Sequence, residues 1–518
     1  MSSHNPLEAL SFRDILSVFR GQDGRKVIPM LLVLFFICFN YSMLRNLKDA
    51  LSITAASAAV IPVLKVWGVL PFAILITLAF TRLSHRYTQE KVFYIITSGF
   101  LIFYAVFAFL IYPYREVLYL YDVAGYLYQW LPASFDGFIS MILYWPLSSF
   151  YIVSELWSSM VMSVLFFGFA NEITKVSQAR LYYSALGIGS NIAAIIAGQL
   201  GVYLSQTPYT PSLPYGSTGW EQGFITMLIL VIVLGITLMA VFRWMNVYVL
   251  STPEYDNLHK GSAIKLKKRL SIRESIRHLA GSKYLLCIAA IVVGYNLVIN
   301  LVEVVWKEEL KMLYPTPEDY YSYLSHLTTV VGIVSTFTAV MMPKILKVLG
   351  WTWTALLTPI VMLVTSAGFF IFLFTNDIGS SISVLGFSPL AIAVFFGGMQ
   401  NCLSKAAKYS VFDTTKEIAF IPLEHETKLR GKAAIDGVGS RFGKSGGAVI
   451  HISLLMLLSS IAASAPYVAV IILIAIGLWI IAVQTLGKEF NTLISKQGQK
   501  FDGETDEEQD QAVNAVSS

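Results

Sequence analysis

Charged side chains are scarce in this chain. Lysine, arginine, aspartate and glutamate together make up 13% of its 518 residues, about half of the fraction found in an average soluble protein. Cysteine is scarcer still, with three residues that lie far apart in apolar surroundings: Cys38, Cys287 and Cys402. These shortages exclude an ordinary soluble globular protein, and they indicate neither a disulfide framework nor a metal cluster.

The N-terminal segment lacks the pattern of a targeting sequence. Residues 1–26 mix acids with bases, whereas a cleavable signal peptide needs a basic start and an apolar core, and a transit peptide avoids acids. The first apolar run begins at about Val27 and is too long for a signal core. We therefore expect 1–26 to be a cytoplasmic N-terminus that precedes the first membrane span.

Long apolar runs are what the chain has in abundance. It is 56% hydrophobic with a mean hydropathy of +0.64, and runs of about twenty apolar residues match the hydrocarbon thickness of a bilayer. The sequence thus predicts an all-α polytopic membrane protein with twelve transmembrane helices in the lipid bilayer. The candidate spans are 27–47, 60–82, 92–112, 138–170, 180–204, 222–247, 284–305, 324–347, 353–375, 382–412, 432–459 and 464–485.

The lysines and arginines are unevenly divided between the connections. The long connection at 249–283 is strongly basic, whereas 205–221 and the connection near Asp377 carry no lysine or arginine. Basic connections tend to remain on the cytoplasmic side of a membrane. Both termini are therefore expected in the cytoplasm, which agrees with an even number of spans.

The basic connection divides the spans into two halves of six that resemble each other weakly. The sequence NLKD at 46–49 ends the first span as NLVE at 300–303 ends the seventh, and LGIGSN at 186–191 and DGVGSR at 436–441 open the fifth and the eleventh. A six-span unit carried twice in one orientation is the architecture of major-facilitator-like carriers. The predicted units are the N-terminal half at 27–248, the basic cytoplasmic linker at 249–283, the C-terminal half at 284–486 and a disordered cytoplasmic tail at 487–518.

A glycine-rich stretch near the C-terminus is similar to a phosphate-binding loop but lacks its first glycine. The loop requires G-x-x-x-x-G-K-[ST], and Val438 stands at the first glycine position ahead of Gly443, Lys444 and Ser445. Such a loop also follows a β-strand in a soluble domain, and no connection here is long enough to form one. The chain is therefore not expected to be an ATP-hydrolysing pump or another enzyme.

Charged residues inside the predicted spans are the candidates for function. A lysine, arginine or aspartate at the centre of a membrane helix costs about 2.5–3.5 kcal/mol, so these side chains are expected to face a water-filled cavity. Arg441 and Lys444 share one face of the eleventh span, and Lys405 lies in the tenth. The alternative is that such lysines lie near helix ends and reach the lipid headgroups.

Two carboxylates and a further lysine lie on spans that line the path in two-half carriers. Lys48 ends the first span, Glu155 lies in the fourth and Glu303 in the seventh, with Lys65 and Asp413 as secondary candidates. They either form ion pairs that only hold the halves together, or a gate that rearranges during transport. The main candidates carry a net charge of about +2, which favours an anion such as a phosphate: Lys48, Lys405, Arg441, Lys444, Glu155 and Glu303.

Aromatic side chains in the spans are candidates for stacking on a flat base. The candidates include Tyr151, Trp157, Tyr295 and Trp306. Since membrane proteins are rich in aromatic residues in any case, each ring has packing as its alternative role.

At these residues the chain resembles the nucleotide transporter family of intracellular bacteria and plastids, members of which exchange ATP for ADP. The resemblance covers nearly the whole membrane region. Its most specific motifs are LRNLKDAL, SELWSS, GFANEIT, NLVEVVWK, KYSVFDTTKEIAFIPL and GKAAIDGVGSRFGKSGG. The resemblance implies a carrier in the inner membrane of a bacterium that draws nucleotides from a host. It also implies that Lys48, Glu155, Glu303 and Lys444 are the charged positions important for transport.

Two departures from the family pattern leave the substrate and the coupling open. Asn46 stands where ATP/ADP exchangers commonly have an acid, and 304–307 read VVWK where they commonly read VTWK. Proton-coupled uptake of nucleoside triphosphates with another base preference is one alternative, and a non-transporting scaffold or receptor is another. The expected partners are a nucleotide and the lipid bilayer, with no nucleic acid and no cofactor. The oligomeric state is open, and a monomer is compatible with the sequence.

Overall fold

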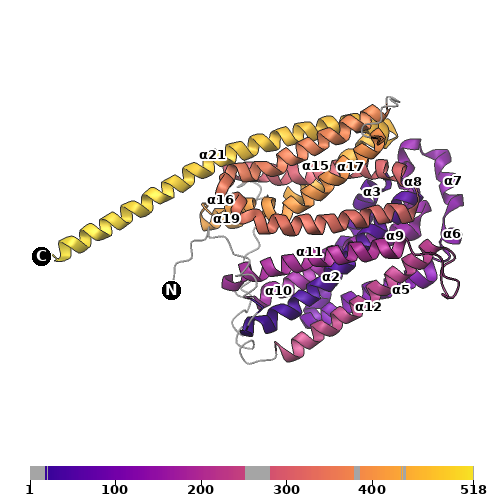
Figure 1. The fold of residues 1–518 in the computed structure, drawn as a ribbon, viewed down its shortest axis with the longest axis horizontal. Helices are drawn as coiled ribbons and strands as arrows, with labels where there is room; N and C mark the ends of the chain where they lie inside the picture. Colours follow the sequence, from indigo (N-terminus) through magenta and orange to yellow (C-terminus); the bar gives the residue numbers. More distant parts are fainter. Residues whose placement is uncertain are drawn as a thin grey trace.

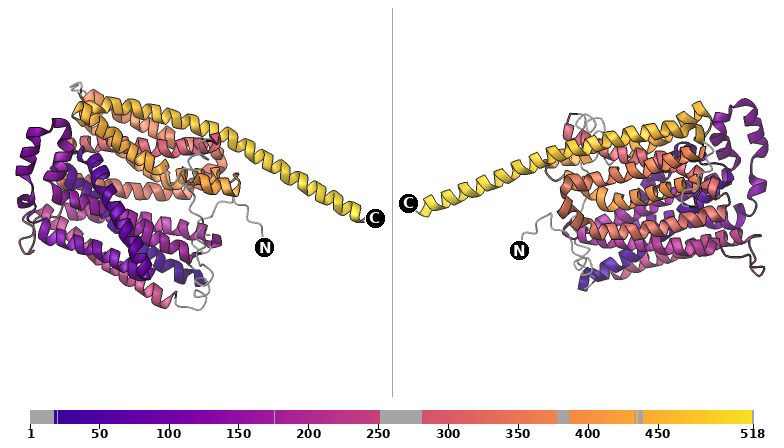
Figure 2. Two further views of the ribbon diagram at one scale, coloured as in Figure 1. Left: turned by 180° about the vertical axis from the view of Figure 1, so that it is seen from behind. Right: turned by 45° about the horizontal axis from the view of Figure 1, so that its top comes forward.

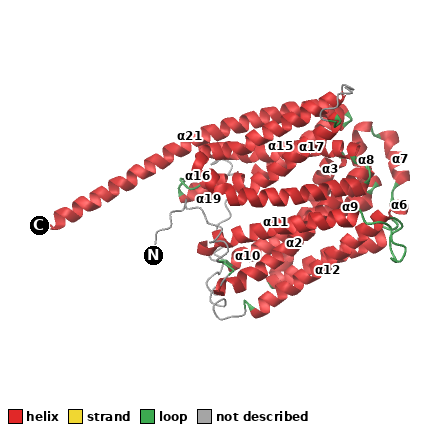
Figure 3. Cartoon of the chain, viewed as in Figure 1, coloured by secondary structure: helices red, strands yellow, loops and turns green. Residues whose placement is uncertain are grey.

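The computed structural model is helical throughout its described regular structure (Figure 3). The side chain of Arg441 and nearly all of the predicted basic linker at 249–283 lie outside the described part of the chain. The described residues are 18–19, 21–174, 176–250, 281–377, 386–432, 434–435 and 439–516.

The N-terminal half supplies six spans, three of which join an α-helix to a π-helical segment. These spans are α2 (Gly21–Ala55), α3–η1–α4 (Val60–Val63, Leu64–Val69, Leu70–Arg86), α5–η2 (Gln89–Val106, Phe107–Ile111), α9–η4–α10 (Trp145–Trp157, Ser158–Phe166, Phe167–Ile173), α11 (Val176–Ser205) and α12 (Gly219–Tyr248). Four short segments connect the third span to the fourth: α6 (Arg115–Leu118), α7 (Tyr121–Trp130), η3 (Ala133–Phe135) and α8 (Asp136–Leu143).

The C-terminal half supplies the other six spans from fewer, longer helices. α16 bends at Gly350, where φ is 70° and ψ is 176°. A residue with a side chain is strained at such a φ, so glycine allows the turn that separates the eighth span from the ninth. The elements of this half are α15 (Lys283–Leu313), α16 (Pro317–Asp377), α17–η5–α18 (Pro389–Ala407, Lys408–Phe412, Asp413–Ala419), α19 (His425–Lys432), α20 (Ser440–Leu458) and α21 (Ile461–Val516).

The predicted all-α fold with twelve spans is confirmed, although some helices begin later than expected, α20 among them at Ser440 rather than at 432. Nine described helical stretches are long and apolar enough to cross a membrane. α16 counts once among them although it supplies two spans, and α17–η5 and α20 complete the twelve. The fourth span begins at Trp145 rather than at 138, because the helix is interrupted at Tyr144. The tenth begins at Pro389 rather than at 382, where the Ser388 hydroxyl accepts a hydrogen bond from the Ala391 amide and so caps the helix.

π-helical turns lie beside the charged positions of the spans. Lys65 lies in η1, Lys408 begins η5, and η4 begins three residues after Glu155. A π-helical turn accommodates an extra residue and often marks a functional site. These turns change the direction in which the neighbouring side chains point, and they do so where the chain carries charge inside the membrane.

The acidic C-terminal segment differs from its expected form. The sequence predicts a disordered tail at 487–518, whereas α21 continues as a helix to Val516 and projects beyond the bundle (Figure 2). Glutamate, glutamine, lysine and alanine are good helix formers, so the segment can extend the last span without a tertiary partner. Figure 2 shows that the projecting part lies well away from the other helices.

The two halves lie side by side, with the N-terminal half below and the C-terminal half above in Figure 1. α11 and α2 pack against α16 at their boundary. A Cβ atom added at Gly198 of α11 would overlap the Thr329 hydroxyl of α16, and one added at Gly332 would lie 2.9 Å from the Asn191 carbonyl oxygen. Glycine therefore allows these helices to approach closely, as small residues do in membrane interfaces.

We predict that Gly198→Ala destabilises the protein. The added methyl group overpacks the boundary between α11 and α16, which should cost about 1–3 kcal/mol. Gly187→Ala, on the same helix, is the control, because a Cβ there meets nothing within 4 Å. The thermal unfolding midpoints of the purified proteins measure the difference, and equal midpoints for the two variants would contradict the prediction.

Candidate functional site

A cavity of about 1940 Å³ lies between the two halves. Its lining reaches Lys347, which is exposed, and Lys428, at the end of the bundle from which α21 projects. At the opposite end the lining stops at Asp49 and Lys307, and none of the described connections beyond them contributes to the wall. The cavity is therefore open at one end of the bundle and closed at the other.

The structure brings most of the predicted site residues to this one cavity. Lys48, Glu155, Glu303, Lys405 and Lys444 all line it, although they come from five different spans. The backbone of Arg441 lies in α20, and its side chain is outside the described residues. The assignment of transport roles to these residues stays a prediction.

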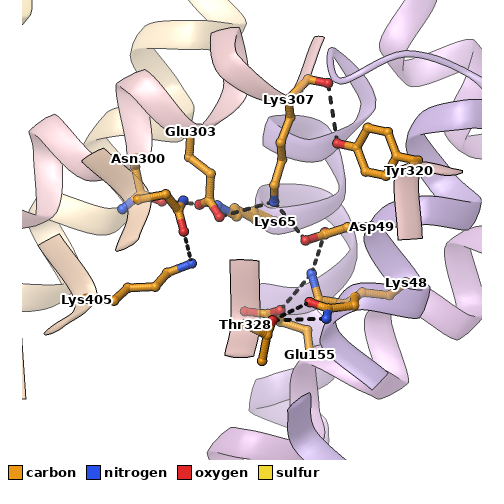
Figure 4. Close-up of polar contacts among 12 residues, drawn as sticks. Lys48, Asp49, Lys65, Glu155, Asn300, Glu303, Lys307, Tyr320, Thr328 and Lys405 are labelled. Atoms are coloured by element: carbon orange, nitrogen blue, oxygen red, sulfur yellow. Dashed lines mark hydrogen bonds and ion pairs between the residues drawn. The ribbon is translucent and has the colours of Figure 1, made fainter. Parts of the chain in front are cut away.

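Six acidic and basic side chains alternate at the closed end of the cavity (Figure 4). We call this set the ion-pair row. Three carboxylates and three ammonium groups make the row neutral. In order, the oxygen–nitrogen distances are Glu155 to Lys48 3.2 Å, Lys48 to Asp49 2.9 Å, Asp49 to Lys307 2.9 Å, Lys307 to Glu303 3.1 Å, and Glu303 to Lys65 3.9 Å.

Local helix geometry explains how the row is assembled. Glu303 and Lys307 are four residues apart on α15, so they lie on one face of the helix. Lys48 and Asp49 are consecutive on α2, and Lys48 also lies over the ring of Tyr151, with its Nζ 3.9 Å from the ring centroid. Such a cation–π contact further stabilises a lysine that is removed from water.

Two pairs in the row join the halves of the protein. Asp49 of α2 pairs with Lys307 of α15, and both side chains are only 4% exposed. Lys65 of η1 reaches Glu303 of α15. Because removing one partner of a buried pair leaves an uncompensated charge, loss of either side chain of Asp49–Lys307 is expected to cost about 3–5 kcal/mol.

Two asparagines that the sequence repeat pairs with each other occupy equivalent positions beside the row. Asn46 of α2 donates to the hydroxyl of Thr328 on α16 at 3.0 Å. Asn300 of α15 accepts from Lys65 on η1 at 3.0 Å. In each case the first helix of one half contacts the second helix of the other half. The arrangement agrees with the weak internal repeat predicted from the sequence.

Contacts to the backbone strengthen the closed end. The Ala58 amide donates to a carboxylate oxygen of Glu308 at 2.6 Å, and Lys311 donates to the carbonyl of Ala56. Both contacts run from the end of α15 to the turn after α2. They satisfy backbone groups where the first span ends, which matters because water is scarce between packed membrane helices.

The sequence analysis missed two members of the row. Asp49 and Lys307 lie inside the quoted motifs LRNLKDAL and NLVEVVWK, yet neither was among the candidates. The available signals were an acid directly beside Lys48 and a base one helical turn after Glu303. Lys65, taken as a secondary candidate, belongs to the row, and Asp413 lines the cavity.

The structure weakens the stacking role predicted for the aromatic residues. Trp157 is not among the residues that line the cavity; its indole N–H donates to the Ile37 carbonyl and its ring packs against Phe100. Tyr295 and Trp306 do line the cavity, but they are at most 2% exposed. We conclude that the ring of Trp157 packs between the helices and does not stack on a base.

Two six-span halves around a central cavity, closed at one end by ion pairs between the halves, define a membrane carrier of the alternating-access class.

The chain belongs to the family described as TLC ATP/ADP transporter, which matches residues 3–490. This confirms the resemblance inferred from its motifs. It is 40% identical to "ADP,ATP carrier protein 1" of Chlamydia muridarum over 482 residues, which cover 92% of this chain and 91% of that protein. It is 38% identical to "ADP,ATP carrier protein 2, chloroplastic" of Arabidopsis thaliana over 478 residues, which cover 91% and 76%. A solved bacterial homologue of the iron transporter ferroportin in an inward-facing state aligns with a TM-score of 0.49 and 12% identity, over 92% of this chain and 99% of that one.

We predict that Asp49 and Lys307 are energetically coupled. Asp49→Asn and Lys307→Met should each destabilise the protein by about 3–5 kcal/mol, and the double variant should lose less than the sum, because it leaves no unpaired charge. The thermal unfolding midpoints of the wild type and the three variants provide the test.

Lys283→Gln is the matched control for this cycle. Lys283 pairs with Glu489 at 3.3 Å, but the two side chains are 71% and 42% exposed, and exposed pairs contribute only about 0–1 kcal/mol. Strict additivity of the Asp49 and Lys307 variants, or an equally large loss from Lys283→Gln, would count against the coupling.

Proposed function

We propose that this chain is a carrier that exchanges nucleotides of the ATP/ADP type across a bacterial inner membrane by alternating access. One observation supports this most directly: a cavity with basic side chains on its wall ends at ion pairs that join the two halves. The names of the related proteins agree with adenine nucleotides as substrates.

Basic residues of the C-terminal half are suited to hold the phosphates. Lys405 on α17 donates to the amide oxygen of Asn401 at 2.5 Å, so its contact is with a neutral group. Lys444 lies on the cavity wall in the second turn of α20, and its side chain is exposed. Lysine ammonium groups form strong charge-assisted hydrogen bonds with phosphate oxygens. Lys444, with Lys405 or Arg441, is therefore our choice for phosphate binding.

The ion-pair row is suited to open at low cost. If the halves separate, the N-terminal half keeps Lys48 and Lys65 with Asp49 and Glu155, and the C-terminal half keeps Lys307 with Glu303. Each half then carries equal numbers of acids and bases. Separation breaks two pairs between the halves but leaves no net charge on either side, so the row can act as a reversible gate.

The predicted orientation assigns the open end of the cavity to the cytoplasm. Both termini are cytoplasmic in this proposal, and α21 projects from the open end (Figure 1). The structure then corresponds to an inward-facing state in which the row closes the outer side. Import of a host nucleotide requires the alternative state, in which the pairs Asp49–Lys307 and Lys65–Glu303 are broken.

We expect labelled ATP to enter liposomes that contain the protein, and preloading them with unlabelled nucleotide to accelerate its entry. Lys444→Ala should reduce this exchange to near background, because the phosphates lose a cationic contact. Lys488→Ala is the control, since Lys488 is exposed on α21 away from the cavity lining. Competition by ATP, ADP, GTP, CTP and UTP identifies the preferred base.

The same assay separates exchange from proton-coupled uptake. Uptake that ignores preloading and collapses with a protonophore would refute the exchange mechanism, and Glu155 and Glu303 would become the first candidates for carrying the proton. Uptake by neither route would leave a scaffold or receptor role.

We predict that Glu303→Gln abolishes exchange and leaves a folded protein. Glu303 bridges Lys307 and Lys65, and its loss leaves Lys307 paired to Asp49. Without Glu303 the row has three lysines and two carboxylates, so the gate would close on an excess positive charge. The buried pair Asp49–Lys307 still joins the halves. Transport rates are compared with monodispersity on size-exclusion chromatography. A Glu303→Gln protein that transports normally would contradict a role in the gate, and one that aggregates would favour a purely structural role.

A further inference from the structure

Arg45 is a cation on the cavity wall that does not belong to the ion-pair row. Arg45 lies on α2 one helical turn before Asp49, lines the cavity and is half-buried. Within the described part of the chain, its guanidinium group makes no side-chain hydrogen bond and no ion pair within 4.0 Å. Tyr41 and the carboxylates of Glu303, Asp49 and Glu155 lie close enough to interact electrostatically with it, and each of these carboxylates is already paired with a lysine.

The neutrality of the row makes Arg45 a charge in excess. Asp49 binds both Lys48 and Lys307, and Glu303 binds Lys307 with Lys65 nearby. No carboxylate of the row is therefore left over for Arg45. An unpaired arginine in a membrane-spanning helix is unfavourable, and such residues are typical of a path for ions or charged substrates.

The internal repeat shows that the two halves differ at this position. Alignment of NLKD with NLVE places Ile299 of α15 opposite Arg45, and Ile299 also lines the cavity. Of these two aligned positions, only the one in the N-terminal half therefore carries a positive charge. Lys405 lines the same cavity from the C-terminal half and contacts an amide rather than a carboxylate.

We propose that Arg45 binds the phosphates of the nucleotide and that its otherwise unpaired charge makes reorientation of the carrier depend on a bound substrate. This inference rests on the proposed function. The planar guanidinium group can donate two parallel hydrogen bonds to one phosphate, which a lysine cannot do. Arg45 belongs to the N-terminal half and Lys405 to the C-terminal half, and both line the cavity, so a nucleotide bound by both would contact the two halves at once.

The empty carrier then meets an electrostatic barrier to closure. Closing the cavity would move Arg45 and Lys405 away from water, while the carboxylates of the row are already paired with lysines, and the two cations would repel each other. A bound nucleotide removes both costs, because it carries several negative charges. The carrier therefore changes state when loaded and stays in place when empty, which is the condition for strict exchange.

Two properties of Arg45 can be separated by substitution. Arg45→Gln removes the charge, and Arg45→Lys keeps the charge but loses the planar fork. Lys347→Gln is the matched control for charge loss, because Lys347 lines the same cavity at its exposed, open end. Thr328 of α16 contacts Asn46, the residue next to Arg45. Lys347 lies nineteen residues after Thr328 on the same helix, roughly 28 Å along it.

The experiment measures efflux of labelled ATP from preloaded liposomes into buffer with and without ATP. The wild type should release label at least tenfold faster when external ATP is present. Arg45→Gln should raise the half-saturating ATP concentration at least tenfold and bring the two efflux rates together. Arg45→Lys should bind more weakly than the wild type but keep the dependence on external ATP. Lys347→Gln should behave as the wild type in the ratio of the two rates.

The inference is overturned if Arg45→Gln keeps the affinity and the rate ratio of the wild type, or if Lys347→Gln changes them equally. If Arg45→Gln transports nothing, equilibrium binding of labelled ATP to the purified, monodisperse variant is measured instead. Binding as tight as that of the wild type would refute phosphate binding by Arg45. If the wild type itself transports no nucleotide, the proposed function fails independently of Arg45. Pyrophosphate then tests the anion site: it should raise the melting temperature of the wild type and not that of Arg45→Gln.

Discussion

The contact between Asp49 and Lys307 is the interaction on which the rest of the structure depends. It joins the first helix of one half to the first helix of the other at 2.9 Å, and both side chains are almost completely buried. Charges in such surroundings are stable only when each has a partner. The pair lies at the closed end of the cavity, and the neighbouring acids and bases extend it into a row in which every carboxylate has an ammonium partner.

The same constraint gives the chain a means of changing state. Lipid surrounds the spans, so a charged residue must face either a partner or water. The row supplies partners at the closed end, and the cavity gives the other basic residues on its wall access to solvent through the open end. In the proposed mechanism, movement of the halves transfers these residues from one environment to the other. The neutrality of each half limits the cost of that exchange, while Arg45 and Lys405 add a positive charge that an anionic substrate can compensate.

Sequence reasoning reached the fold and much of the site. Apolar runs of bilayer length gave the twelve spans, and scarce charges inside them led to Lys48, Glu155 and Glu303, which share one cavity. Boundaries were less accurate, because Tyr144 interrupts the helix before the fourth span and no change in hydropathy marks that break. Trp157 was interpreted by its residue type as a possible base contact, whereas its neighbours in space make it part of the packing.

The sequence by itself determined the number of spans, the division into two halves and the family, because these depend on local composition and on short motifs. Only the tertiary structure decided which acid meets which base. Asp49 and Lys307 are separated by 258 residues, and helical periodicity assigns a residue to a face without stating which helix that face contacts. The same limit explains why Arg45 stood out only in three dimensions: its significance lies in the carboxylates around it, all of which are bound to other residues.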